Sequence, residues 1–192
     1  EIEAASDAEG LFLQDRIGAQ WPVHSRHLQS GESCKLILAN DTALNFLNAS
    51  VVTNNLGGLQ DATLPPLLVY GNVGVDAITG RSFNLEVSNT TAYRPFNLAR
   101  NGLNGEFGQI NLDAPRDGSG EDYVWTAFTF AFKDNQTGEP VTLGRFRFSF
   151  FDFDEAYSGR ARECLTTRGY TDVRVGSQGV TQPECDGPRP RL

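Results

Sequence analysis

Two alternating aspartates at the end of an aromatic run are the residues best placed to do chemistry in this 192-residue chain. Residues 148–154 read FSFFDFD, and a further carboxylate follows at Glu163. On an extended strand, Asp152 and Asp154 share one side with alternate Phe residues, so they lie on the apolar side of the strand. Buried carboxylates without partners are costly, and Ca²⁺ binds about six to eight oxygen ligands of this kind. The pattern therefore predicts a calcium site formed by Asp152, Asp154 and Glu163.

A solvent-exposed turn is the alternative interpretation of the same aspartates. In that case Asp152 and Asp154 cap the turn or pair with Arg160 and Arg162, since aspartates are common in loops. The sequence lacks the EF-hand pattern of alternating Asp residues followed by Gly and a distant Glu. The residue types alone leave both interpretations open.

The elements around this segment have the pattern of β-strands. Residues 124–132 alternate apolar and small residues, and residues 144–154 alternate Phe with Arg and Ser. A polar loop with Gly and Pro joins them, so we expect two adjacent antiparallel strands whose Phe ladders face one core. No segment keeps a 3.6-residue apolar period, which predicts few or no helices. The predicted fold class is an all-β, antiparallel β-sandwich that is jelly-roll-like.

The length and charge of the chain narrow the class of protein further. We expect a loosely attached N-terminal arm at 1–33, one β-sandwich domain at 34–176 and a C-terminal tail at 177–192.

The chain has 24 Asp and Glu against 16 Lys and Arg, a formal net charge of −8. Nucleic-acid binding needs a surplus of basic residues and is not expected. No apolar stretch approaches the roughly 20 residues of a transmembrane helix.

The three cysteines favour an oxidising compartment. A Cys164–Cys185 disulfide would close a loop near the C-terminus and stabilise the fold by roughly 3 kcal/mol. Cys34 is then left as a buried thiol or as a link to another chain. Three cysteines allow three single pairings, and their spacing does not select one. A zinc site is not expected, because the chain has no C-x-x-C motif and its two histidines lie in a polar segment.

Four Asn-x-Ser/Thr sequons point in the same direction as the cysteines. They begin at Asn40, Asn48, Asn89 and Asn135, which predicts N-glycosylation. We therefore expect a secreted protein that is extracellular or bound at the cell surface.

Several motifs together resemble a family of domains. Residues 68–74 read LVYGNVG, residues 105–112 read GEFGQINL, and the FSFFDFD strand is followed by Arg162-Glu163 and Gly169-Tyr170. Over roughly residues 66–176 this resembles a calcium-binding β-sandwich domain of secreted and cell-surface proteins of bacteria and algae. The resemblance implies an extracellular, calcium-stabilised module without enzymatic activity. The cysteines near the C-terminus and the basic tail lie outside it.

The sequence contains few motifs that would support an enzymatic function. No G-x-S-x-G motif is present, and no phosphate-binding loop. We expect a non-enzymatic module of extracellular adhesion or assembly, with protein subunits or an extracellular glycan as its partner. It could form a homo-oligomer through the N-terminal arm or Cys34. A carbohydrate-binding module is the alternative, and a glycoside hydrolase using Asp152 and Glu163 ranks below both.

Overall fold

The fold is described from a computed structural model of the chain. It describes residues 2–4, 11–16, 42–115, 119–120, 123–150, 162–167 and 170–173. These residues form antiparallel sheets and contain no helix of seven residues or more. The all-β prediction is therefore confirmed, whereas the sandwich arrangement stays a prediction.

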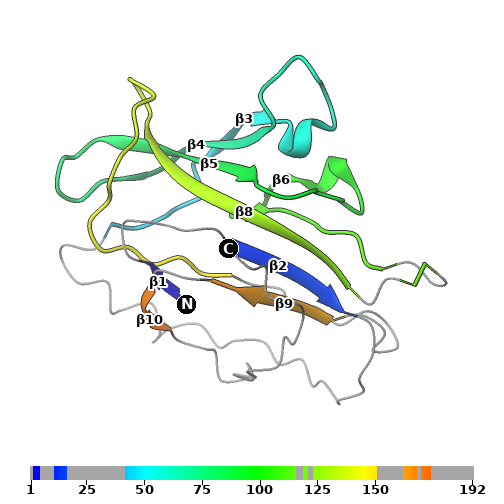
Figure 1. Cartoon of the computed structure of the whole chain (residues 1–192). Coiled ribbons are helices and arrows are strands. Elements are labelled where there is room, and N and C mark those ends of the chain that lie inside the picture. Colours follow the sequence, from blue (N-terminus) through cyan, green and yellow to red (C-terminus); the bar gives the residue numbers. More distant parts are fainter. Residues whose placement is uncertain are drawn as a thin grey trace.

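The described residues contain ten strands and two short 3₁₀ turns (Figure 1). In chain order they are β1 (Ile2–Ala4), β2 (Leu11–Arg16), β3 (Ser50–Asn54), η2 (Leu56–Gly58), β4 (Leu67–Val75), β5 (Ser82–Asn89), η3 (Leu98–Arg100), β6 (Gly102–Asn104), β7 (Phe107–Gln109), β8 (Tyr123–Asp134), β9 (Arg162–Thr166) and β10 (Tyr170–Val173). The main sheet has six strands in the order β3-β4-β5-β8-β2-β9. β6 pairs with β7, and β1 pairs with β10.

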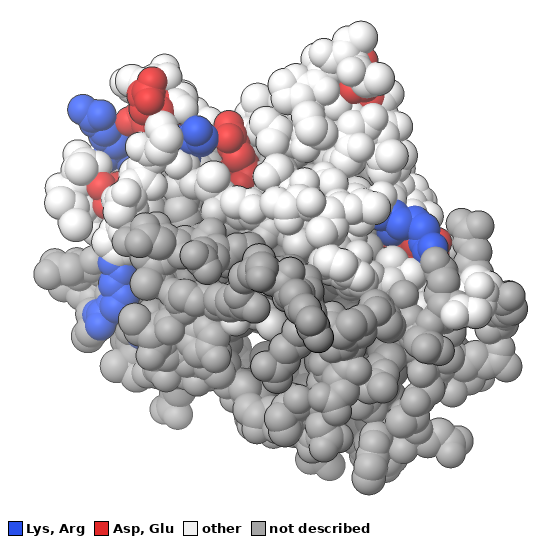
Figure 2. Space-filling model, in the orientation of Figure 1, with Lys and Arg blue, Asp and Glu red and all other residues white. Residues whose placement is uncertain are grey.

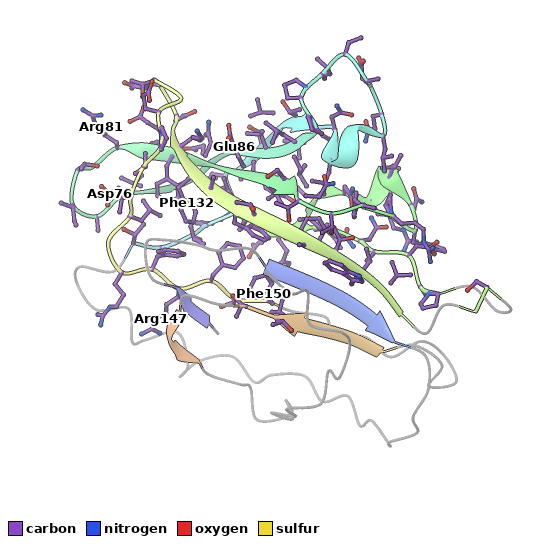
Figure 3. The ribbon with its side chains drawn as sticks, in the orientation of Figure 1. Asp76, Arg81, Glu86, Phe132, Arg147 and Phe150 are labelled. Carbon is purple, nitrogen blue, oxygen red and sulfur yellow. The ribbon has the colours of Figure 1, made fainter. Side chains whose placement is uncertain are left out.

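The long strand β8 crosses the middle of the main sheet, and its two faces differ in character. Its predicted alternation over 124–132 is confirmed. Leu85 of β5 lies opposite Phe132 of β8, and Val87 lies opposite Phe130, so these side chains share the core face. Glu86 lies opposite Ala131 on the other face. Figure 3 shows Glu86 and Phe132 on opposite sides of the sheet. One face therefore holds the core, and we call the opposite one the outer face.

The segment 141–150 covers part of the core face. The ring of Phe146 lies edge-on to Phe132 with centroids 5.0 Å apart, and Phe148 meets Phe130 at 5.2 Å. The two Phe ladders do face one core, as predicted. The prediction of adjacent strands is wrong, because the neighbours of β8 in the sheet are β5 and β2. The segment pairs with β8 only near its start, where the Val141 N–H donates to the Phe132 carbonyl.

Residues 42–49 form a second covering segment, which lies against the C-terminal end of β4. Leu44 forms an isolated bridge with Gly74, and the Asn45 N–H donates to the Val73 carbonyl over 2.7 Å. A Cβ at Gly74 would lie 2.7 Å from the Ala43 carbonyl oxygen. Glycine is needed here because the two backbones approach so closely.

The N-terminal segment supplies two of the described strands. β2 lies between β8 and β9, with Leu11 opposite Phe128 of β8, and β1 pairs with β10. Such pairing differs from the loose attachment expected of the 1–33 arm. The boundaries at residues 33 and 176 stay a prediction.

The stacked Phe rings lead to a first prediction. Phe146→Ala should lower the free energy of unfolding by about 3 to 5 kcal/mol, because it removes a buried ring from the core. Phe96 is 69% exposed, so Phe96→Ala should change that free energy by no more than about 0.5 kcal/mol. Urea denaturation of the two variants measures the difference. Equal, small effects would show that 141–150 does not cover the core.

Candidate interaction surface

Residues 42–75 are almost free of charge. Charged residues make up 21% of the whole chain, yet Asp61 is the single charged residue in this stretch. It forms β3, the loop after it and β4. Figure 2 shows the corresponding upper right part of the molecule largely without Lys, Arg, Asp or Glu. A solvent-exposed segment with so few charged residues is unusual in an acidic protein.

Exposed apolar side chains gather in the same stretch. Among the described residues, six of the nine exposed large hydrophobic side chains lie between residues 42 and 75. They are Leu47, Val51, Val52, Leu59, Leu64 and Val75. All except Val75 belong to residues 47–66, which comprise β3 with its flanking segments. We call these residues the uncharged edge because neither β3 nor the segment before it carries a charge; their single charged residue is Asp61, in the loop after β3. The exposed apolar side chains are therefore concentrated in one segment of the sequence, and exposed apolar surface can mark a site of protein interaction.

β3 forms one boundary of the main sheet. β4 is the only described strand that pairs with it. β6 lies next to β3 without pairing with it, since a Cβ at Gly102 would lie 3.2 Å from Val51 Cγ2. Boundary strands usually carry charged residues that prevent pairing with another chain. β3 reads SVVTN and has none, whereas β9 at the opposite boundary contains Arg162 and Glu163. β3 therefore lacks the charged residues that usually protect such a strand.

A β-bulge projects Val52 from this strand. Val51 lies opposite Tyr70 and Thr53 opposite Val69, so Val52 has no partner residue on β4. Its side chain is 62% exposed. A Cβ at Gly71 would lie 2.7 Å from Val52 Cγ2, so glycine at position 71 leaves the space that Val52 uses.

The loop after β3 is held by one buried amide. Asn55 is 1% exposed. Its Nδ2 lies 2.8 to 3.0 Å from the carbonyl oxygens of Asp61, Leu64 and Pro65, which share its two hydrogens. Its Oδ1 accepts from the backbone N–H groups of Gln60 and Asp61. These hydrogen bonds fix the backbone that carries the exposed Leu59 and Leu64.

A second polar network fixes the β6–β7 hairpin beside β3. Asn54 Nδ2 donates to the Asn101 carbonyl at 3.0 Å. The Tyr93 hydroxyl donates to the Asn111 carbonyl at 2.6 Å and lies 3.0 Å from Asn101 Oδ1. Burial raises the pKa of Tyr93 to about 12, so the phenol keeps its proton at neutral pH.

Two buried carboxylates serve as acceptors in turns. Backbone N–H groups of Thr137 and Gln136 hold the pKa of Asp134 below its ordinary value. Burial acts to raise the pKa of Asp76, but hydrogen bonds from Thr79 and its neighbours outweigh it and lower that pKa. Asp134 also meets Arg81 at 3.5 Å. Both carboxylates are therefore ionised and occupied by structural hydrogen bonds.

Most of the predicted metal and cysteine positions lie outside the described residues. This applies to Asp152, Asp154, Cys34 and Cys185. The structure describes the backbone of Glu163 and Cys164, which lie on β9 opposite Asp15 and Gln14 of β2. Among the side chains that it describes, no group of three His, Cys, Asp or Glu could hold a metal ion. The calcium site and the disulfide stay predictions.

The sequons differ in accessibility. Asn48 and Asn135 are exposed, and Asn40 lies outside the described residues. Asn89 is half-buried, and its Nδ2 donates to the Thr91 carbonyl at 2.8 Å. Of the three described sequons, Asn48 and Asn135 therefore offer the more accessible amides.

The uncharged edge was not among the predicted sites. Hydrophobicity alone does not show whether Val51 or Val52 is buried, because β-branched residues are common in both positions. The absence of charge over residues 42–75 is the sequence signal that could have indicated it.

Comparisons with known proteins found no similar protein. No protein-family model matches the chain, and neither a curated protein nor a solved structure gives a match. Within the described residues, no helix has the length and apolar character needed to cross a membrane.

The role of Asn55 leads to a second prediction. Asn55→Ala should lower the free energy of unfolding by about 2 to 4 kcal/mol, because buried carbonyl and N–H groups lose their partner. Thr63 is exposed in the same loop, and Thr63→Ala should cost less than about 1 kcal/mol. Thermal melts compare the variants. A cost for Asn55→Ala no larger than that for Thr63→Ala would mean that the amide does not hold the loop.

Proposed function

We propose that the protein is a non-enzymatic extracellular module that acts in adhesion or assembly by binding a protein partner at the uncharged edge. The observation that carries this proposal is the boundary strand β3, which is uncharged and bears the exposed Val51 and Val52. An extended segment added beside β3 would form main-chain hydrogen bonds with it and cover the apolar side chains.

The surrounding loop suits such binding. Asn55 fixes the backbone of residues 60–65 through hydrogen bonds from both ends of its amide, so Leu59 and Leu64 are presented on an ordered frame. A preorganised surface loses less conformational entropy when its partner binds. The partner is therefore expected to be an extended, largely uncharged segment with β-branched residues.

Calcium and secretion form the second part of the proposal. Asp152, Asp154 and Glu163 would bind Ca²⁺ in a structural role, and Cys164 would bridge to Cys185. Glu163 lies on β9 of the main sheet, so a cation bound there would tie the preceding segment to the fold. The exposed sequon at Asn135, which lies outside the uncharged edge, supports an extracellular location.

Sugar binding is the second candidate function, and the outer face of the sheet favours it. Asn84, Glu86 and Ser88 of β5 lie on this face beside Thr129 and Lys133 of β8. All are half-buried. Figure 2 shows a hollow between the β3–β4 loop and the turn after β8, and Glu86 lies in that region in Figure 3. Polar side chains on a hollowed sheet can hydrogen-bond the hydroxyls of a glycan.

Panning with a phage library of linear random peptides tests the protein-binding function. The immobilised full chain should enrich uncharged, β-branched peptides, because these can extend the sheet at β3. Val52→Lys should weaken their binding at least tenfold by placing a charge on the edge. Ile78→Lys is the matched control, since Ile78 is 76% exposed in the β4–β5 turn, away from β3.

Two results would count against the protein-binding function. One is the absence of any enriched peptide, and the other is equal weakening by Val52→Lys and Ile78→Lys. If panning enriches no peptide, and the wild-type chain binds glycans that Glu86→Ala does not bind, sugar binding replaces protein binding as the proposed function.

Calcium removal tests the metal site. The melting temperature of the full chain should fall by several degrees in excess chelator, because a bound ion stabilises the folded state by mass action. Asp152→Ala should melt at the chelator value under both conditions. A melting temperature that does not depend on calcium would leave the two aspartates as residues of a turn.

A further inference from the structure

We infer that the partner of the uncharged edge is a second copy of this chain, with β3 of the two copies paired antiparallel about a two-fold axis. This inference rests on the proposed function and names its partner. It joins the two main sheets into one continuous sheet across the dimer.

The sequence of β3 suits such self-pairing. A two-fold axis at the middle of Ser50–Asn54 places Val52 opposite Val52 of the second copy. Val51 then lies opposite Thr53, and Ser50 opposite Asn54. Every cross-strand pair is uncharged, and β-branched residues opposite one another stabilise antiparallel pairs. A two-fold interface also closes on itself and gives a dimer instead of a fibre.

The charge distribution favours a second copy at this edge. Two copies of net charge −8 repel each other, and the repulsion is weakest where the facing segments carry little charge. Asp61 is the only charged residue between residues 42 and 75. A strongly charged partner would gain nothing from such a surface, because electrostatic recognition needs complementary charges.

The bulge at Val52 is matched in a second copy. A bulge increases the local twist of a strand and usually separates a boundary strand from a straight neighbour. Two copies related by an axis through Val52 carry the same bulge at the same register, so their twists agree. The exposed Val52 side chain would then be covered by its own equivalent.

Sedimentation equilibrium of the full chain, produced without glycans so that Asn48 beside β3 is bare, tests the inference. The wild-type chain should form a dimer with increasing concentration. Val52→Lys should raise the dissociation constant at least tenfold, because two ammonium groups would face each other. Ile78→Lys should leave it unchanged. Circular dichroism melts show that both variants remain folded.

Oxidative cross-linking locates the contact. Residues directly opposite in an antiparallel pair have Cα atoms about 4.5 to 5.5 Å apart, which a disulfide can span. In a Cys34→Ser background, which removes the unpaired native thiol, Val52→Cys should give covalent dimers under mild oxidation. Val75→Cys and the Cys34→Ser chain alone should not. Val75 is also exposed, at 52%, but lies at the far end of β4.

The outcomes separate this inference from the proposed function. A monomer at all concentrations, with peptides enriched on the wild-type chain, overturns the second copy and leaves the protein-binding function standing. A dimer that Val52→Lys does not weaken and Val52→Cys does not trap overturns pairing through β3. If the chain is a monomer at all concentrations and panning enriches no peptide, both the second copy and the protein-binding function are overturned.

Discussion

The structure depends on the one-sided apolar pattern of β8 and β5 in the centre of the main sheet. Leu85, Val87 and Phe128 are buried on the core face, so that face must be covered by further chain. Two segments without long strands of their own, 42–49 and 141–150, supply part of this cover. The Phe rings that meet there contribute edge-to-face contacts in addition to their buried area.

The same arrangement explains why β3 is the vulnerable boundary of the sheet. The covering segment 42–49 leads directly into β3, so the strand is fixed in position, while β4 is the only described strand that pairs with it. Asn55 then holds the following loop, and glycine at position 71 leaves space for Val52. The apolar side chains are therefore held at the surface by a rigid frame. A surface so constructed is better suited to a partner than to solvent.

The period-two pattern predicted β8 and its faces because alternation reports directly which side of a strand is buried. It did not predict that 141–150 would cross the core, since alternation does not specify what the backbone pairs with. The pairing of β2 was missed for a related reason: six residues among polar neighbours give no signal of a long-range partner. The predicted site residues Asp152 and Asp154 lie outside the described residues. Recognising the uncharged edge requires knowing which of its apolar side chains are exposed, and the exposure of a side chain is defined only in the folded chain.

Hydrogen–deuterium exchange at low and high protein concentration tests the central claim most directly. It reports on the backbone amides of β3 without any mutation. If two copies pair through this strand, the amides of Ser50–Asn54 will exchange more slowly at high concentration, while those of the β4–β5 turn will not change. Exchange at β3 that is independent of concentration, in a sample that does associate, would contradict the account.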